Sequence, residues 1–415
     1  MRTVEWINFC IMCLFFICYS YQFFYIPVSW FKKPKQHKES VRHRLAVLIA
    51  ARNEEAVIGN LLDSLRNQDY PADYLDVYVV ADNCTDATAE TARSHGAVVY
   101  ERENREQVGK GYALNYLLKK IDEESGIFYD AYLVFDADNV LRPNFISEMN
   151  QTFSDGYDIV TCYRNSKNYG DNWISAGYAL WFLRESRYLN GARMLLGSSC
   201  AVSGTGFLFS DRILRKHGGW NFFLLTEDIE FTVANVVQGE KVGYCRNAEL
   251  YDEQPVSFRQ SWRQRMRWSR GYLQVAGRYG GALIKGIFRG SFSCFDMAMN
   301  IMPAAVLSGV SILVNLGAII ANFVSLGAWG ELAWSILQML VNLYLTMFVL
   351  GGITVVTEWK KIHTAAWKKI AYVFTFPLFM FIYIPICIAA IFKNPQWAPI
   401  RHSRNLKLED ICAKE

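Results

Sequence analysis

The sequence predicts two kinds of structure in one chain, an α/β, Rossmann-like domain and an α-helical transmembrane region. Of its 415 residues, 52% are hydrophobic and 20% are charged. No charged residue occurs in the stretches 6–31, 297–330, 332–357 and 370–392. Between the first two of these stretches, short apolar runs alternate with helical patterns, as in βαβ units. This pattern excludes a disordered chain, a disulfide scaffold, a fibrous repeat and a wholly soluble protein.

Each uncharged stretch exceeds the roughly 20 residues that cross a bilayer as a helix. The first is longer than the apolar run of a signal peptide, about 7–15 residues, and no small-residue cleavage site follows it. We therefore expect an uncleaved anchor over residues 1–31. A basic linker over residues 32–44 comes next, which by the positive-inside rule places the following domain in the cytoplasm. The predicted location is the cell membrane, with several crossings.

The number of crossings stays open. Transmembrane helices are expected over residues 297–392 and a tail over residues 393–415. The basic residues Arg401, Arg404 and Lys407 favour a cytoplasmic tail, whereas four crossings from an outside N-terminus would place the tail outside. Prolines in the last stretch make it the least secure span.

Residues 45–250 predict one α/β domain. We expect strands over residues 45–50, 75–80, 97–100 and 132–135, and helices over residues 55–66 and 112–121. Ligands of open α/β sheets bind at the carboxyl ends of the strands. Asp82 and the pair Asp136 and Asp138 follow such strands directly. Neither a G-x-G-x-x-G after the first strand nor a P-loop is present, which disfavours dinucleotide and P-loop sites.

The Asp136-Ala137-Asp138 segment is typical of a divalent-cation site. Two carboxylates one residue apart suit a hard cation whose other ligands are water and phosphate oxygens. Such a cation would neutralise a diphosphate leaving group. A solvated turn is the alternative, but the position directly after an apolar strand favours the metal.

The Thr226-Glu227-Asp228 segment precedes a helical pattern. All three residues favour a helix start by capping or electrostatics. A carboxylate at the mouth of a site is also suited to accept a proton from a hydroxyl. The two roles are compatible, with Thr226 as the cap and Asp228 as the reacting group.

Residues 251–296 predict basic amphipathic helices. From Gln254 to Phe295 there are eight Lys and Arg residues and no acidic one. One interpretation is contact with the anionic inner leaflet. Another is that Arg265 or Arg267 binds a diphosphate while Trp268 stacks on a sugar. We expect no nucleic-acid partner, because the basic run adjoins a membrane anchor.

Together these motifs resemble the processive family 2 glycosyltransferases, such as hyaluronan synthase, cellulose synthase and the poly-N-acetylglucosamine synthases. The resemblance covers about residues 45–290. It depends on the order of Asp82, Lys110, D-x-D, Gly204-Thr-Gly-Phe207, T-E-D and Gln264-x-x-Arg267-Trp268 ahead of membrane helices. Because Q-x-x-R-W also occurs in ceramide glucosyltransferase-like enzymes that add one sugar, it does not establish processivity.

The resemblance implies a GT-A-like domain and an inverting hexosyltransferase. This enzyme would use a UDP-sugar and Mg²⁺ or Mn²⁺ to elongate, and translocate, a β-linked polysaccharide. A single addition to a lipid acceptor is the alternative, and a catalytically silent UDP-sugar-binding scaffold is a third. The implied partners are the UDP-sugar, a growing polysaccharide or lipid-linked acceptor, and anionic lipids.

The resemblance also implies roles for single residues. Asp228 would be the catalytic base, and Asp138 with Asp136 would bind the metal. The implied nucleotide-sugar residues are Ala51, Arg52, Glu54, Asp82, Lys110, Asp136, Gln264, Arg267 and Trp268. The implied acceptor residues are Gly204, Thr205, Gly206, Phe207, Glu227 and Trp268.

Overall fold

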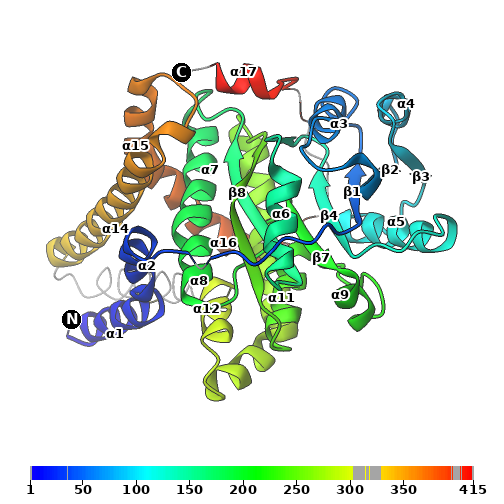
Figure 1. The fold of residues 1–415 in the computed structure, drawn as a ribbon. Coiled ribbons are helices and arrows are strands. Elements are labelled where there is room, and N and C mark those ends of the chain that lie inside the picture. Colours follow the sequence, from blue (N-terminus) through cyan, green and yellow to red (C-terminus); the bar gives the residue numbers. More distant parts are fainter. Residues whose placement is uncertain are drawn as a thin grey trace.

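A mixed sheet of eight strands forms the centre of the α/β domain (Figure 1). The structure is a computed structural model that describes residues 2–34, 36–301, 314, 317, 329–393, 395, 402 and 404–413. The strand order is β3-β2-β1-β4-β7-β6-β8-β5. The strands are β1 (Leu45–Ala51), β2 (Leu75–Asp82), β3 (Val98–Arg102), β4 (Ala131–Asp136), β5 (Val140–Leu141), β6 (Ile159–Ser166), β7 (Phe207–Ser210) and β8 (Val242–Asp252).

The sheet collects several strand ends at one edge. β1 is parallel to β2 and β4, whereas β7 is antiparallel to both β4 and β6. Because β6 is in turn parallel to β8, the carboxyl ends of β1, β2, β4, β6 and β8 share an edge with the start of β7. This edge is where the predicted site residues lie.

The four strands expected from the sequence are confirmed to within two residues at each end as β1 to β4. The helix expected from residue 55 starts later, at Ile58, as α3 (Ile58–Arg66). The reason is a turn in which the N–H groups of Val57 and Ile58 both donate to the carbonyl of Glu54. Asn53 precedes this turn with a φ of 58°, so the chain cannot enter the helix directly from β1.

Helices cover both faces of the sheet, and each face has its own apolar core. One core includes residues of α3, α4 and α6; the other includes residues of α5, α7, α9 and α10. The remaining domain helices are α4 (Thr88–Ser94), α5 (Lys110–Glu124), α6 (Phe145–Ser154), α7 (Trp173–Arg184), α8 (Gly191–Leu196), α9 (Asp211–Lys216) and α10 (Glu227–Val236), with 3-10 turns at Ala72–Tyr74 and Trp359–Lys361. A π-helical turn (Glu185–Asn190) joins α7 to α8.

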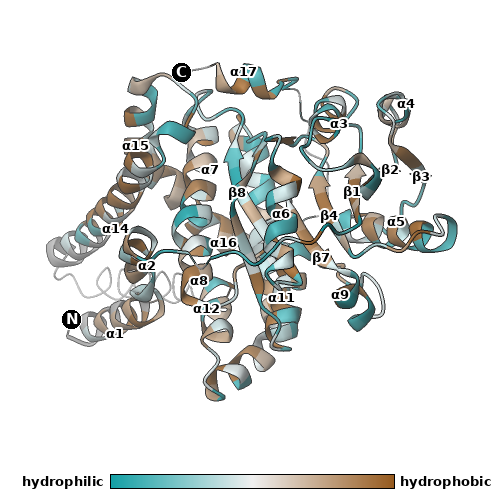
Figure 2. Ribbon diagram, in the orientation of Figure 1, coloured by the Kyte–Doolittle hydropathy of each residue, from teal (hydrophilic) through white to brown (hydrophobic). Residues whose placement is uncertain are grey.

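Three helical stretches within the described residues are long and apolar enough to cross a membrane. They are Phe9–Phe31, Leu340–Thr357 and Ala366–Phe392, and Figure 2 shows them as largely hydrophobic. The corresponding helices are α1 (Arg2–Tyr19), α2 (Tyr21–Phe31), α14 (Trp329–Thr357), α15 (Ala366–Phe381) and α16 (Tyr383–Phe392). The last stretch, which its prolines made least secure, thus qualifies as a candidate span, whereas most of the expected span 297–330 lies outside the described residues.

The candidate membrane helices and the domain share a core. Val355 of α14 and Phe376 and Phe379 of α15 are buried in the same cluster as α7 and the sheet. A buried ion pair joins Arg193 of α8 to Asp296 of α12 (Phe292–Ile301) at 2.7 Å. The helical segments before and after the domain are therefore packed on it directly, and not joined only through linkers.

The basic segment forms one long helix, α11 (Phe258–Phe288), followed by α12. Two described candidate spans lie between the domain and the tail, and the tail then returns to the domain. Its last helix, α17 (Leu408–Cys412), places Ile411 in a buried cluster with Val140 and Tyr251. The tail and the domain are therefore in direct contact.

Candidate functional site

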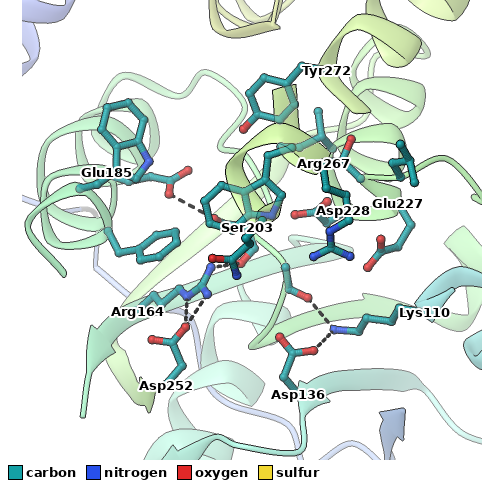
Figure 3. Close-up of a pocket in the computed structure, with 18 of the residues that line it drawn as sticks. Lys110, Asp136, Arg164, Glu185, Ser203, Glu227, Asp228, Asp252, Arg267 and Tyr272 are labelled. Carbon is teal, nitrogen blue, oxygen red and sulfur yellow. Dashed lines mark hydrogen bonds and ion pairs between the residues drawn. The ribbon is translucent and has the colours of Figure 1, made fainter. Parts of the chain in front are cut away.

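A cavity of about 420 Å³ lies at the edge of the sheet where the strands end, and residues of the candidate membrane helices also line it. Figure 3 shows part of its lining. We call the wall formed by the strand ends the sheet side. We call the opposite wall the membrane side; it is formed by α1, α2, α7, the π-helical turn after α7, α11, α12, α15 and α16. The predicted residues that line the cavity are Ala51, Arg52, Glu54, Asp82, Lys110, Asp136, Asp138, Gly204, Glu227, Asp228, Gln264, Arg267 and Trp268.

Three predicted acceptor residues do not line the cavity. The hydroxyl of Thr205 accepts a hydrogen bond from the backbone N–H of Asp136 at 2.9 Å and donates to Asn139. A side chain at Gly206, where φ is 64°, would collide with Leu250. Phe207 is buried in the core of the domain. These residues fix the loop that carries Gly204, and only Gly204 of the four reaches the cavity.

Lys110 and Asp136 form an ion pair on the sheet side. The Nζ of Lys110 lies 2.5 Å from the carboxylate of Asp136 and donates to the carbonyl of Gly204 at 2.8 Å. Lys110 is the first residue of α5, and Asp136 is the last residue of β4. The pair places a cation in the cavity and leaves Asp138 as the second acid of the D-x-D segment.

Asp138 is the buried carboxylate of the sheet side. It accepts a hydrogen bond from the backbone N–H of Glu253 at 2.7 Å. Burial alone would raise the pKa of Asp138, but the charges of His402 and Lys167 outweigh burial and hold that pKa below its usual value. Asp138 is therefore ionised over the ordinary pH range, as a metal ligand must be.

The residues around Asp138 fit a hard divalent cation that binds together with a diphosphate. Within the described part of the chain, no three His, Cys, Asp or Glu side chains converge closely enough to hold an ion alone. Mg²⁺ typically takes one or two carboxylates plus phosphate oxygens in nucleotide sites. Asp138 supplies the carboxylate, and oxygen ligands of this kind also suit Mn²⁺.

His402 is a site residue that the sequence did not reveal. Its Nδ1 lies 3.0 Å from both carboxylate oxygens of Glu54, although 348 residues separate the two. Burial lowers the pKa of His402, but the nearby carboxylates of Asp138 and Glu54 outweigh burial and raise it to about 10. The sequence shows only a histidine in a basic tail. Its contact with Glu54 depends on how the chain between the two residues folds, which the sequence pattern does not predict.

The tail is attached at several further points. The backbone N–H of Arg404 donates to Glu253 at 2.9 Å, and its guanidinium donates to Asp171 at 2.8 Å. The side chain of Asn60, in α3, donates to Asn405 at 2.8 Å. His402 therefore belongs to a segment that hydrogen bonds attach to α3 and to the residues that follow β6 and β8.

Arg164 and Asp252 are two more residues of the sheet side that sequence reasoning missed. The Nε of Arg164 donates to Asp252 at 2.7 Å. Burial raises the pKa of Asp252 to about 6, and Arg164 partly offsets that effect. Asp252 ends β8 as Asp82 ends β2. The rule that identified Asp82 would have found Asp252 if β8 had been recognised as a strand of the same sheet.

Glu227 and Asp228 lie at the start of α10 and project into the cavity beside Arg267 (Figure 3). Burial, together with the charge of Asp228, raises the pKa of Glu227 to about 7. Burial also raises the pKa of Asp228, which hydrogen bonds to the backbone of Ile229 and Gly204 partly offset. A carboxylate with a raised pKa is a stronger base than an exposed one and is suited to take a proton from a hydroxyl.

Contrary to the prediction from the sequence, Thr226 does not cap α10 with its side chain. Thr226 occupies the N-cap position of α10 but makes no side-chain capping hydrogen bond. It packs instead against Gly271 of α11, where an added Cβ would lie 2.5 Å from the Thr226 side chain. Close approach of α10 to α11 therefore replaces the cap.

The structure separates the two arginines that the sequence left open. Arg267 lines the cavity, as do Gln264 and Trp268. Arg265 is fully buried away from it and donates to the carbonyl of Phe379 at 2.9 Å. Within the described residues, the buried Oε1 of Gln264 has no hydrogen-bond partner, so this cavity residue carries an unused acceptor.

The fold and the site define a glycosyltransferase. Residues 43–271 match the family described as glycosyltransferase like family 2. Since this match covers more than half of the chain, the chain belongs to that family. The GT-A-like fold is also that of a solved mannosyltransferase from Pyrobaculum calidifontis, in complex with GDP-mannose and Mn²⁺. It has 16% sequence identity and a TM-score of 0.57, over 91% of this chain and 96% of that one.

Curated relatives fall into more than one class. A β-monoglucosyldiacylglycerol synthase of Nostoc is 26% identical over 297 residues, which are 68% of this chain and 60% of the relative. A probable glycosyltransferase of Bacillus subtilis is 26% identical over 57% of each chain. A poly-β-1,6-N-acetyl-D-glucosamine synthase of Staphylococcus epidermidis is 23% identical over 64% of this chain and 63% of the relative. The chain thus spans about six tenths of the length of these relatives.

Proposed function

We propose that the chain is a membrane-bound, inverting hexosyltransferase that uses a UDP-sugar. The observation that carries this proposal is the single cavity that contains Asp228, the cations Lys110 and Arg267, and the buried carboxylate Asp138. It supplies a base, a diphosphate-binding pair and a metal ligand within one space. The strand-end residues Ala51, Arg52, Glu54 and Asp82 would hold the nucleoside.

The donor diphosphate would lie between the two walls of the cavity. Lys110 and Arg267 offer positive charge to its oxygens, and the amide of Gln264 adds a polar contact. Asp138 would hold Mg²⁺ or Mn²⁺ together with phosphate oxygens of the donor. When bound, such a cation neutralises the charge that develops on the leaving diphosphate. The Mn²⁺ in the related mannosyltransferase structure supports this assignment.

In the reaction, the carboxylate of Asp228 takes the proton of an acceptor hydroxyl. The hydroxyl oxygen forms a bond to the anomeric carbon as the bond from that carbon to the diphosphate oxygen breaks on the opposite face. UDP leaves with the bonding electron pair, and Lys110 and Arg267 stabilise its added charge. Attack on the opposite face inverts the configuration, so an α-linked donor gives a β-linked product.

The membrane side of the cavity favours an acceptor held by a lipid. Its walls include Leu189, Met299, Ile301 and Met380, which are apolar and lie next to the candidate spans. An apolar chain that enters from the bilayer would keep its hydrocarbon out of water there. The name of the glucosyldiacylglycerol synthase relative agrees with a lipid acceptor.

A processive polysaccharide synthase is the second candidate, and the aromatic side chains of the cavity favour it. Trp181, Trp268, Tyr272 and Tyr383 also line the cavity. Aromatic rings stack on the apolar faces of sugars, so a polymer could pass along them. The Staphylococcus relative named as a poly-N-acetylglucosamine synthase agrees with this alternative.

We further propose that the enzyme is a multi-pass protein of the cell membrane with its domain and tail in the cytoplasm. In α11 and the turn after it, the exposed basic residues are Arg259, Arg263, Arg278, Lys285 and Arg289. Basic residues close to a membrane attract anionic headgroups. These five residues would therefore contact anionic lipids, while Arg267 faces the cavity.

The decisive experiment is a screen of radiolabelled UDP-sugars with the purified full-length chain, Mn²⁺ and membrane lipid. We expect one donor to be cleaved, with the label transferred to a lipid-soluble product one sugar larger than its acceptor. A long polymer would replace the first candidate by the second. Binding of UDP with no cleavage of any donor would contradict both candidate enzymes. The remaining hypothesis would then be a catalytically silent UDP-sugar-binding scaffold.

A further inference from the structure

A carboxylate that the proposed transfer does not use also lines the cavity. Glu185 is the first residue of the π-helical turn between α7 and α8. Such turns are rare and occur frequently at functional sites. The continuous helical segment supplies Trp181, Arg184, Glu185 and Leu189 to the same wall. The turn therefore shapes the membrane side and places a charged group on it.

Glu185 has few partners for a carboxylate inside a cavity. The hydroxyl of Ser203 donates to its Oε2 at 3.1 Å, and no ion pair to Glu185 occurs in the described part of the chain. The guanidinium of the adjacent Arg184 donates instead to Gln22 at 2.9 Å. Burial raises the pKa of Glu185, and the charges of Arg164 and Arg193 partly offset this. A carboxylate that lines a cavity and accepts one hydrogen bond can accept further hydrogen bonds from a ligand.

Glu185 lies close to the reacting groups without belonging to them. Its partner Ser203 adjoins Gly204, and an added Cβ at Gly204 would lie 3.9 Å from the carboxylate of Asp228. In the view of Figure 3, Glu185 and Tyr272 lie on the side of Asp228 away from Lys110 and Asp136. The charge of Asp228 also raises the pKa of Glu185, so the two carboxylates are close enough for one acceptor to contact both.

Tyr272 adds a second polar group to this side. It lines the cavity from α11, one helical turn after Trp268. Burial raises the pKa of its phenol, and the charges of Glu185 and Asp228 add to that effect, so the phenol lies near both carboxylates. A carboxylate, a phenol and the indoles of Trp181 and Trp268 in one cavity are the groups that bind a sugar ring, by its hydroxyls and by its apolar faces.

We propose that Glu185 binds ring hydroxyls of a sugar at the end of the acceptor. The inference rests on the proposed function and names its acceptor class: a membrane-anchored molecule that ends in a carbohydrate. A lipid whose reactive hydroxyl belongs to the lipid itself has no vicinal hydroxyls to offer Glu185. Such a lipid would leave the carboxylate with its single hydrogen bond from Ser203.

A binding experiment tests this without any donor. Saturation-transfer NMR on the full-length chain in lipid nanodiscs would use methyl β-D-glucoside and methyl N-acetyl-β-D-glucosaminide as probes, with 1-butanol as the sugarless control. We expect saturation transfer to at least one sugar, and a loss of at least about fivefold in Glu185→Gln. The matched control Glu124→Gln, at an exposed end of α5, should behave as the wild type. Equal signals from sugar and butanol, or an unchanged signal in Glu185→Gln, would overturn the proposal.

A turnover experiment separates this inference from the proposed function. With the donor that the wild type cleaves, octyl β-D-glucoside and 1-octanol would be compared as acceptors. We expect Glu185→Gln to raise the KM for the glucoside about tenfold, or about 1.4 kcal/mol, because the variant loses hydrogen bonds to a charged group. The KM for the donor should stay within about twofold. Tyr272→Phe should raise the KM for the glucoside by a smaller factor.

The outcomes of the two experiments are distinct. Equal use of octanol and the glucoside by an active wild type would contradict the sugar-ended acceptor and leave the transferase intact. If the wild type cleaves no donor, the proposed function fails, and the NMR titration alone decides whether Glu185 binds a sugar. Thermal unfolding of each variant shows whether its fold is retained.

Discussion

The two sides of the cavity are built in opposite ways. On the sheet side, each of the carboxylates Asp82, Asp136 and Asp252 has a cationic partner at hydrogen-bond distance: Arg102, Lys110 and Arg164. On the membrane side, Glu185 has one neutral partner, and most of the wall is aromatic or apolar. The sheet side is therefore ordered by its own charges, while the membrane side leaves polar groups for a ligand.

This difference indicates where affinity and specificity arise. A diphosphate with its cation carries charge that a preorganised set of ion pairs can accept with little rearrangement. An acceptor that varies among relatives needs a wall that can change without disturbing that set. Family members with different acceptors would then share the sheet side and differ on the membrane side.

The largest effect is expected at Asp228, which lies between the two sides. Asp228→Asn should lower transfer by about 10³-fold or more, because general base catalysis contributes about 10²–10⁴. Binding of UDP and of the sugar probes should stay within about twofold, since the substitution keeps the shape of both walls. Rates and binding constants measured on one preparation check this. Appreciable transfer by the variant would remove Asp228 as the base.

Asp138 tests the sheet side alone. Asp138→Ala should lower activity by about 10²-fold, since loss of metal ligands or of their partners costs about 10–100-fold in metal affinity or activity. Added Mn²⁺ should restore part of the activity, and the KM for the acceptor should not change. Titration with Mn²⁺ and with EDTA measures both effects. A wild type that resists EDTA would contradict a metal at this carboxylate.

The pH dependence tests the carboxyl pair on α10. Burial raises the pKa of Glu227 to about 7 and also raises the pKa of Asp228 above that of an exposed aspartate. The base is lost when Asp228 takes up a proton, so kcat/KM should fall about tenfold per pH unit below the pKa of Asp228. Glu227→Gln removes the neighbouring charge and should move this limb to lower pH. A limb that stays in place would show that the two groups titrate independently.

His402 should have the smallest effect of the four. His402→Ala removes the partner of Glu54 and a positive charge near Asp138. We expect the KM for the donor to rise about fivefold, with the KM for the acceptor unchanged. The exposed His37, which pairs with Asp155 at a distance from the cavity, offers His37→Ala as the control. An unchanged donor KM would mean that the tail only covers the site.

The sequence predicted most of the sheet side, and the reason is local. Strands with apolar runs end in acids, so Asp82, Asp136 and Asp138 could be placed at one edge from periodicity alone. Asp252 escaped because β8 was not recognised. All four residues from Gly204 to Phe207 were predicted to bind the acceptor, and the fold places only Gly204 at the cavity. The sequence alone does not show which side chains of a loop face the core.

The membrane side could not be predicted in the same way. Glu185 and Tyr272 come from different helices, and a π-helical turn has no sequence period that marks it. His402 reaches Glu54 only because the chain returns after α16. Each depends on contacts between segments far apart in sequence, for which neither hydropathy nor spacing gives a signal. The choice between Arg265 and Arg267 likewise required the packing of α11 on α15.

The return of the tail also sets the order in which the site can be finished during synthesis. A ribosome makes Glu54 and Asp138 long before His402, and α14, α15 and α16 emerge in between. The tail segment can reach Glu54 only after those helices have been placed against the domain that shares their core. The donor site would thus gain its last residue, His402, after the helices have been inserted. A nascent chain that is not yet in the membrane would therefore have an incomplete donor site.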